Sequence, residues 1–426
     1  MSSPDALVYL DTAEAPRLVG SLWTSSRHGR ESASLEFDPD WLKDPIHFAL
    51  GPAVAPGPGR FVTPEGHRLF GAIGDSAPDR WGRGLLLQRE RQRARDANET
   101  PRALRELDYL LGVADGTRMG ALRFKTTVNG PFLGESGSSQ VPPLLELPHL
   151  MRAAMTLEAD ADHAAVLDAL RVLLAPGSSL GGARPKASVR DQSGRLSIAK
   201  FPKATDTRDV ARWEAVMLRL ADKAGIPVPE HQVFSIENRS VLVMARFDRR
   251  GESRVPFLSA MSLLTARDGD VRSYVEIAEE LRRIEGPGRE GGPALWRRIV
   301  FNILASNFDD HLRNHAILFD GAYWALSPAY DLNPVPAYEQ GRKLSTAIHF
   351  DGDQTASLEV ALDAASEFDL DARNARNIIG EVAKAVARWR TEALATGIKH
   401  GEIEEMASAF EHPEAHAAQR LSSAIS

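Results

Sequence analysis

Residues 306–314 read Ser306-Asn307-Phe308-Asp309-Asp310-His311-Leu312-Arg313-Asn314, a stretch with two aspartates followed by an asparagine. It places Asp309 five positions before Asn314, and a second aspartate, Asp331, follows within Tyr330-Asp331-Leu332. Phosphoryl transfer requires a base for the hydroxyl proton and oxygen ligands for the magnesium ion that neutralises the phosphates. An aspartate, an asparagine and a later aspartate in this order therefore predict a phosphoryl-transfer site.

The residues between Asn314 and Asp331 predict a β-hairpin. Two short apolar runs, 316–319 and 322–326, flank Asp320-Gly321, and glycine accepts the positive φ that a tight turn needs. Because a hairpin returns the chain to its starting point, we expect Asp331 to lie beside Asn314. A helix over residues 295–305 is expected to lead into the loop. The alternative is a surface turn, rich in aspartate and asparagine, that binds no ligand.

A second segment has the composition of a nucleotide-binding loop. Residues 177–186 are rich in glycine and serine and lead into two expected strands, 187–189 and 196–201. Glycine lets backbone N–H groups approach phosphate oxygens closely, although the segment is neither a Walker A motif nor Gly-x-Gly-x-x-Gly. Lys200 ends the second strand, where a lysine can pair with phosphates. The alternatives are a linker and a solvent-exposed lysine at a strand end.

Taken together, these residues resemble the HipA-like serine/threonine kinases of bacterial toxin–antitoxin modules. The resemblance rests on five segments and extends to residues 70–83 and 119–124 in the N-terminal part; the five are Ser179 to Lys186, Lys200, Arg246 to Arg249, Asn307 to Asn314, and Tyr330 to Leu332. It implies an α+β, two-lobed protein-kinase-like fold with a small N-terminal α+β accessory domain.

The resemblance also implies a role for each residue of the site. Asp309 is expected to be the catalytic base, and Asn314 and Asp331 are expected to hold Mg²⁺. The residues expected to bind ATP, besides Asn314 and Asp331, are Gly181, Gly182, Ala183, Lys186, Lys200, Ala245, Phe247 and His311. Among them, Ala245 and Phe247 edge the adenine. From the residues themselves, we expect His311 to brace the catalytic loop by hydrogen bonding. Ser179 matches a serine that family members autophosphorylate, with Ser178 as the neighbouring alternative.

These landmarks divide the chain into four predicted parts. Residues 1–125 form the accessory domain, 126–144 a linker, 145–254 the nucleotide-binding lobe, and 255–426 a helical lobe with the catalytic loop. Further expected elements are helices over 80–97, 209–224, 271–284, 369–396 with a break, and 403–418, and strands over 232–236 and 241–249.

The composition limits the classes of function. The 426 residues carry a formal net charge of −7, which disfavours autonomous nucleic-acid binding, and the absence of cysteine excludes disulfides and thiolate metal sites. No apolar run approaches the ~20 residues that span a bilayer, and residues 1–5 lack the features of a signal peptide, so we expect a cytoplasmic protein.

The resemblance implies partners as well. The expected antitoxin is a small helix-turn-helix protein (HipB-like), DNA is reached only through it, and the substrate is a translation protein such as an aminoacyl-tRNA synthetase. Two alternatives remain open from the residues alone. One is a small-molecule kinase, and the other is a catalytically idle scaffold that acts as a co-repressor with antitoxin and DNA.

Overall fold

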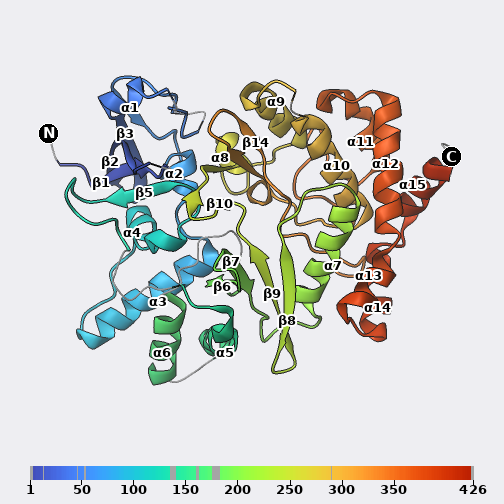
Figure 1. Cartoon of the computed structure of the whole chain (residues 1–426), viewed down its shortest axis with the longest axis horizontal. Coiled ribbons are helices and arrows are strands. Elements are labelled where there is room, and N and C mark those ends of the chain that lie inside the picture. Colours follow the sequence, from blue (N-terminus) through green and yellow to red (C-terminus); the bar gives the residue numbers. More distant parts are fainter. Residues whose placement is uncertain are drawn as a thin grey trace. The chain divides into compact units, whose positions relative to one another are not determined.

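The computed structural model describes residues 3–12, 14–45, 47–51, 54–134, 141–159, 163–174, 183–288 and 290–423 (Figure 1). The chain forms two compact units. The first unit comprises Met1–Thr205 and Ser235–Arg267, and the second comprises Asp206–Phe234 and Asp268–Ser426. The finer division at residues 125, 144 and 254 stays a prediction.

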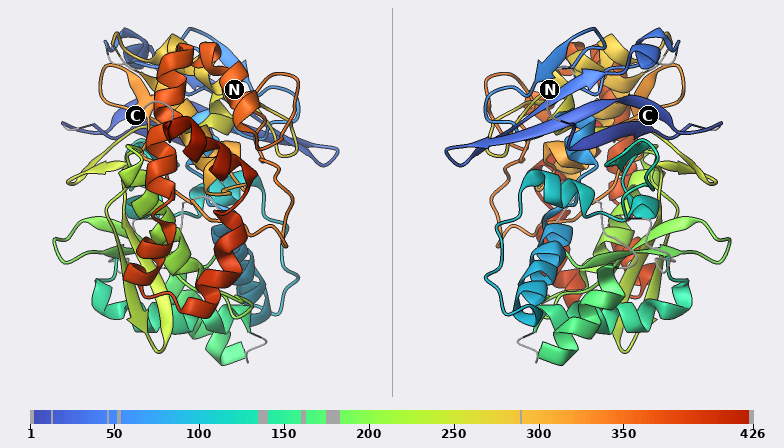
Figure 2. Two further views of the ribbon diagram at one scale, coloured as in Figure 1. Left: turned by 90° about the vertical axis from the view of Figure 1, so that its right-hand side faces the viewer. Right: turned by 90° about the vertical axis from the view of Figure 1, so that its left-hand side faces the viewer.

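The first unit begins with a five-stranded sheet in the order β4-β3-β2-β1-β5. Its strands are β1 (Ala6–Leu10), β2 (Arg17–Arg27), β3 (Arg30–Phe37), β4 (Arg60–Val62) and β5 (Leu122–Lys125). The right-hand view of Figure 2 shows the blue strands side by side. His28 and Gly29 turn the β2–β3 hairpin with φ of 50° and 76°, as a tight hairpin turn requires. Leu22 and Leu35 face each other across these strands and are fully buried.

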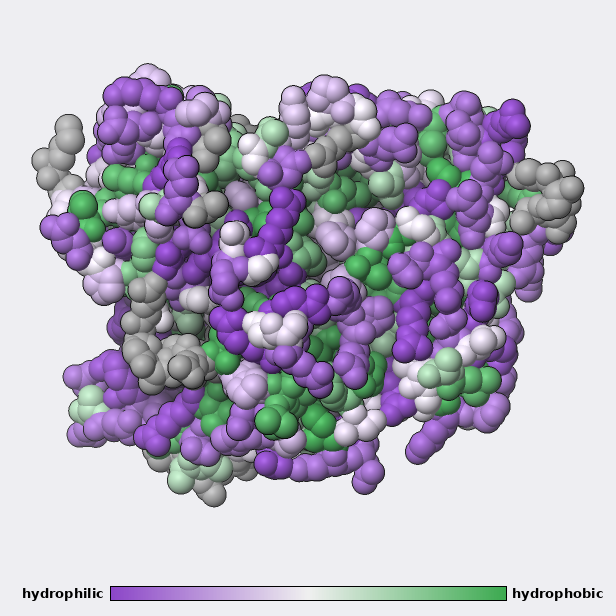
Figure 3. Space-filling view, viewed as in Figure 1, coloured by the Kyte–Doolittle hydropathy of each residue, from purple (hydrophilic) through white to green (hydrophobic). Residues whose placement is uncertain are grey.

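Several helices of the first unit begin at a side-chain cap. They are α1 (Pro39–Lys43), α2 (Gly71–Asp75), α3 (Arg80–Asp96), α4 (Glu106–Leu111), α5 (Leu147–Glu158), α6 (His163–Leu174) and α8 (Ala260–Leu263). The predicted helix over 80–97 is confirmed as α3, which Asp79 caps by accepting a hydrogen bond from the Gly82 N–H. Figure 3 shows mainly hydrophilic side chains over α3, as its arginine-rich sequence requires.

A second sheet of the first unit carries the predicted nucleotide-binding strands. Its antiparallel strands are β6 (Lys186–Arg190), β7 (Leu196–Lys200) and β9 (Arg239–Ala245). The boundary between the two units falls within β8 (His231–Ile236). The predicted strand over 241–249 is too long, because β9 ends at Ala245. The residues that follow include the buried side chains of Arg246 and Asp248. Short strands β10 (Arg249–Arg250), β11 (Ser253–Arg254) and β12 (Phe257–Ser259) follow.

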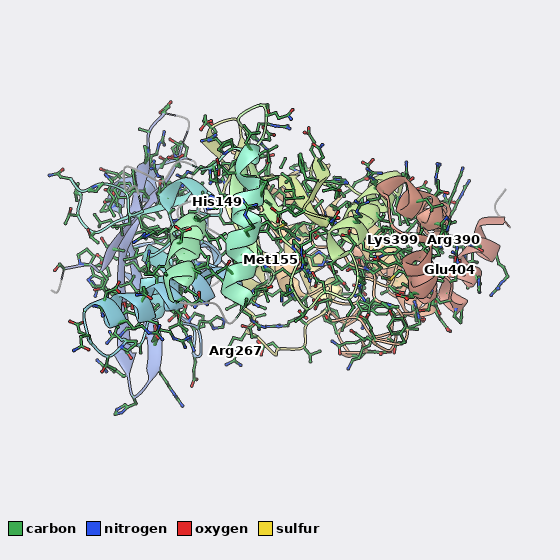
Figure 4. All side chains as sticks on the ribbon, turned by 90° about the horizontal axis from the view of Figure 1, so that it is seen from below. His149, Met155, Arg267, Arg390, Lys399 and Glu404 are labelled. Carbon is green, nitrogen blue, oxygen red and sulfur yellow. The ribbon has the colours of Figure 1, made fainter. Side chains whose placement is uncertain are left out.

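The second unit is mainly helical. Its helices are α7 (Val210–Lys223), α9 (Tyr274–Ile284), α10 (Gly291–Leu304), α11 (Leu358–Asp363), α12 (Ala372–Val386), α13 (Trp389–Thr396), α14 (His400–Met406) and α15 (Pro413–Ser423). The predicted helix over 369–396 with a break is confirmed as α12 and α13. Arg390 of α13 and Glu404 of α14, both labelled in Figure 4, form an ion pair at 2.5 Å that joins these helices.

The predicted single helix over 403–418 is wrong. It is divided into α14 and α15 because Pro413, which has no N–H to donate, begins a new helix. The His412 ring accepts a hydrogen bond from the Ala415 N–H at 3.2 Å and so satisfies one end of α15. No helix among the described residues combines the length and the apolar character needed to cross a membrane.

Candidate active site

The catalytic loop follows directly from α10, whose buried face anchors it in the second unit. Leu295, Ile299 and Ile303 of this helix are fully buried. The helix ends at Leu304, and Ser306 adopts a positive φ of 50°, which is uncommon for a non-glycine residue. This turn directs the chain into a segment that leaves Asp309 exposed and Asn314 buried.

Asn314 is oriented by a hydrogen bond within the loop. Its side-chain Nδ2 donates to the backbone carbonyl of Asp309 at 3.0 Å. Because the amide nitrogen is used in this contact, the Oδ1 atom is left to act as an acceptor or a metal ligand. The bond therefore fixes the Asn314 amide relative to the backbone of Asp309.

The β-hairpin predicted between Asn314 and Asp331 is confirmed as β13 (Ala316–Phe319) and β14 (Trp324–Leu326), which pair antiparallel. It returns the chain to the catalytic loop, where the Tyr330 hydroxyl donates to the Arg313 carbonyl at 2.6 Å. Tyr330 and Arg313 immediately precede the two expected metal ligands, so this bond joins the two ligand-bearing segments.

Asp331 adopts a φ of 60°, in the left-handed region that aspartate and asparagine tolerate better than most residues. Backbone strain of this kind persists only where the surroundings enforce it, and it gathers at functional sites. Here the surroundings include a buried chain of amides. Asn302 accepts from Asn307 at 2.9 Å, and Asn307 in turn accepts from the Asn333 backbone N–H at 2.9 Å.

Asp310 is the centre of a buried network that holds the loop. Its carboxylate accepts hydrogen bonds from the Tyr274 hydroxyl at 2.5 Å and from Asn302 Nδ2 at 2.7 Å, and His315 Nε2 lies 2.7 Å away. Burial alone would raise the pKa of Asp310, but His315, the hydrogen bonds and the charge of Arg298 bring this pKa below its ordinary value. Asp310 is therefore a buried carboxylate that holds the loop in place through these contacts.

The prediction that the His311 side chain braces the loop is wrong, because a different histidine makes this contact. The brace is His315, whose ring contacts Asp310, whereas Nδ1 of His311 is buried without a hydrogen-bond partner among the described residues. Sequence reasoning also missed Asp310, although its place beside Asp309 was a signal. Tyr274 and Asn302 gave no such signal, because they reach Asp310 from α9 and α10.

We expect Asp310→Ala to lower the free energy of unfolding by about 3–5 kcal/mol, because it leaves several buried donors without an acceptor. Asp309→Ala, one residue away and exposed, should change it by less than about 1 kcal/mol. Urea denaturation compares the two variants. Since the folded-state pKa of Asp310 is lowered, its contribution is present above its ordinary value of 3.8 and is lost as pH falls below that value. Equal stability of the two variants would contradict the network.

The electrostatics of Asp309 differ from those of its neighbour. Desolvation raises the pKa of Asp309, and the charges of Asp331 and Asp310 raise it further, against the opposing charge of His311. We therefore expect Asp331→Asn to lower the pKa of Asp309, since one of the repelling charges is removed. NMR titration of the side-chain carboxyl carbon measures it in both proteins. An unchanged pKa would show that the two carboxylates do not interact.

The nucleotide-binding residues predicted for the first unit lie in and after its second sheet. Lys186 and Lys200 are directly opposite in the β6–β7 register, so their side chains share one face of the sheet. Lys186 is buried and pairs with Asp79 at 2.7 Å, and the Trp81 indole N–H donates to the Lys186 carbonyl at 3.1 Å. The N-terminal end of α3 thus fixes the start of β6. A contact of Lys186 with phosphates stays a prediction.

The remaining predicted positions are distributed differently. Ala183 is exposed, and Ala245 and Phe247 are partly exposed at the end of β9. Gly181, Gly182, Ser178 and Ser179 lie outside the described residues. The second unit brings Asp309, Asn314 and the segment of Asp331 together, whereas Lys200, Ala245 and Phe247 belong to the first unit.

The donor set fits magnesium better than a transition metal. Within the described ranges, no group of three His, Cys, Asp or Glu side chains could hold a metal ion. One carboxylate and one amide oxygen are hard ligands, and Mg²⁺ is commonly bound by one or two protein oxygens together with substrate phosphates and water. Asp331 and Asn314 supply that kind of pair.

Comparison with known proteins gives concordant results. Residues 178–389 match the family model of the HipA-like C-terminal domain. The Sinorhizobium fredii protein Y4mE, whose name classes it as a candidate kinase, is 26% identical over 415 residues, covering 87% of this chain and 89% of Y4mE. Y4dM of the same organism, named likewise, is 30% identical over 182 residues, covering 39% of this chain and 41% of Y4dM.

A solved complex of HipA, HipB and operator DNA from the toxin–antitoxin system of Shewanella oneidensis MR-1 contains a chain with a similar fold. The TM-score is 0.66 with 16% identity, over 98% of this chain and 96% of that chain. At this identity the likeness concerns the fold. It confirms the predicted α+β, kinase-like architecture.

Proposed function

This chain belongs to the HipA-like kinase family, and on that premise we propose that it is an ATP- and magnesium-dependent protein serine/threonine kinase. The observation that carries the proposal is the convergence of Asp309, Asn314 and the Asp331 segment in one braced loop system. A binding scaffold has no need of a base and two metal ligands held in this way. The family match alone would not separate an active kinase from an idle one.

The proposed chemistry follows from the residues. Asp309 accepts the proton of the substrate hydroxyl as the oxygen attacks the γ-phosphorus of ATP, and ADP leaves. Its raised pKa strengthens it as a base. Asn314 Oδ1 and the Asp331 carboxylate would hold magnesium, which neutralises the phosphate charge when bound. We assign phosphate contacts to Lys200 and the loop from Gly181 to Lys186.

We further propose that this kinase is the toxin of a two-gene module in the cytoplasm. The supporting observation is the fold shared with a chain from a complex that also contains HipB and operator DNA. The partner would be a helix-turn-helix antitoxin, and the net charge of −7 agrees with DNA contact through that partner only. The substrate would be a translation protein. Failure of the neighbouring gene's product to co-purify with this chain would contradict the pairing.

One experiment separates this proposal from the two alternatives. The purified protein is incubated with γ-labelled ATP and cell lysate, with and without Mg²⁺. A labelled protein band that requires Mg²⁺ supports the protein kinase. A labelled small molecule would identify a small-molecule kinase, and no label in any fraction would leave the catalytically idle scaffold.

Autophosphorylation is a further expectation from the family. Protein produced with Asp309 intact should carry phosphate on Ser179 or Ser178, and Asp309→Asn protein should lack it. A phosphoserine adds about −1.5 to −2 charge, which the phosphates of ATP would repel, so modified protein should bind ATP more weakly. Peptide mass spectrometry makes the comparison. Equal phosphate in both proteins would mean that another kinase adds it.

A further inference from the structure

The segment that follows β9 is buried despite its charges. Arg246 and Asp248 have side chains that are each 1% exposed, and the Asp248 carboxylate pairs with Arg246 at 2.5 Å and with Arg249 at 2.6 Å. Burial would raise the pKa of Asp248, but the two arginines and a backbone donor lower it to about 2. Asp248 is therefore an anion held between two cations directly after the proposed adenine edge, Ala245 to Phe247.

These charged groups are attached to one stretch of backbone near the N-terminal sheet, residues 117–120. Arg246 donates to the Thr117 carbonyl at 2.6 Å and to the Arg118 carbonyl at 3.1 Å. Arg249 donates to the same Arg118 carbonyl at 2.7 Å. The Gly120 N–H donates to Asp248 at 2.8 Å. Each segment thus donates hydrogen bonds to the other.

The backbone of residues 117–120 is itself held firmly. The Arg118 side chain is fully buried and donates to the carbonyls of Ser76, Leu110 and Val113 at 2.8–3.0 Å. Gly120 has a φ of 72°, and a Cβ there would lie 3.1 Å from the Phe257 Cβ, so a side chain would disturb the close approach. The attachment point is therefore a rigid one.

We propose that residues 117–120 set the position of the adenine-binding edge, with Asp248 as the positioning residue that joins the two. The inference rests on the proposed function and deepens it, since it makes the N-terminal part of the chain a component of nucleotide recognition. Adenine recognition by a backbone edge depends on where that edge is placed. A displacement of about 1 Å at a positioned group lowers the rate of an enzyme by up to about 10²-fold. Asp248 fixes this placement without touching the nucleotide.

A buried ionic link suits this role better than a role in stability alone. Replacing a buried ion pair by well-packed apolar residues is often neutral or stabilising, so stability does not require the charges. The forked guanidinium donors of Arg246 and Arg249, and the Asp248 carboxylate that they share, instead fix both the distance and the orientation between the two segments. The pair of Lys186 with Asp79 is a second buried ionic link in the first unit, at the start of β6.

The test compares two ligands that differ in the adenosine part. ATP and inorganic tripolyphosphate, each with Mg²⁺, are titrated calorimetrically into wild type and Asp248→Asn. We expect Asp248→Asn to weaken ATP binding by at least about tenfold, because charge-assisted hydrogen bonds are lost, and to change tripolyphosphate binding by less than about twofold. The matched control is Asp191→Asn, which alters an aspartate–arginine pair in the β6–β7 turn of the same sheet. It should bind both ligands as wild type does.

The outcomes distinguish this inference from the proposed function. Wild type that binds no ATP would overturn the proposed function, and the inference with it. ATP binding by folded Asp248→Asn equal to that of wild type would overturn the inference alone, as would an equal loss for both ligands. If Asp248→Asn does not fold, Arg249→Lys decides by the same two affinities, because it keeps the charge and loses the forked contact.

Discussion

Asp309→Asn is expected to lower the turnover of phosphate transfer by at least about 10²-fold, the lower range for a positioned acid–base group. The substitution keeps the size of the side chain and removes the group that accepts the hydroxyl proton. ATP binding should survive, since the proposed magnesium ligands are unchanged. The exposed position of Asp309 predicts that the fold is also unchanged.

Steady-state transfer from labelled ATP, paired with a melting curve, measures this effect. The matched control is Asp353→Asn, an exposed aspartate whose carboxylate accepts hydrogen bonds from Thr355 in its own turn. The control should retain wild-type turnover. Wild-type turnover in Asp309→Asn would remove Asp309 from the mechanism.

Asp331→Asn should reduce turnover by at least about 10²-fold as well, but through the metal. A bound magnesium ion contributes several kcal/mol of charge stabilisation, and loss of its carboxylate ligand forfeits much of that. Unlike Asp309→Asn, this variant should also need more Mg²⁺ for half-maximal rate and should bind ATP more weakly. Asparagine is chosen because it tolerates the φ of 60° at this position.

Asp369→Asn is the control for backbone effects. Asp369 also has a φ of 60° and pairs with Arg282 at 3.3 Å on the surface of the second unit. It should leave the rate and the Mg²⁺ dependence unchanged. The reaction rate is measured against Mg²⁺ concentration for wild type, Asp331→Asn and Asp369→Asn. An unaltered Mg²⁺ requirement in Asp331→Asn would exclude Asp331 as a ligand.

Local chemistry made the catalytic loop and its hairpin predictable from the sequence. Asp320-Gly321 specifies the turn between β13 and β14, and the turn decides where Asp331 returns. The helix over 80–97 and the break within 369–396 were also predicted and are present, as α3 and as α12 followed by α13. The turn signal of the hairpin is contained within two residues.

Contacts between distant segments were beyond the sequence. Asp310 accepts a hydrogen bond from Tyr274, which lies 36 positions away in the sequence, and Asp248 accepts one from Gly120, which lies 128 positions away. No periodicity or motif encodes such pairs in a single chain. The bracing histidine was misassigned for this reason, because the choice between His311 and His315 depends on where the buried carboxylate lies.

In the proposed mechanism, Asp309 directs transfer of a phosphoryl group to a protein hydroxyl. The most direct measurement is acid hydrolysis of protein labelled by this kinase from γ-labelled ATP, followed by identification of the labelled amino acid. Wild type with Mg²⁺ should yield phosphoserine or phosphothreonine, and Asp309→Asn should yield neither above background. Labelled phosphoserine or phosphothreonine from Asp309→Asn in the amount that wild type gives, or no labelled residue from wild type, would contradict this role of Asp309.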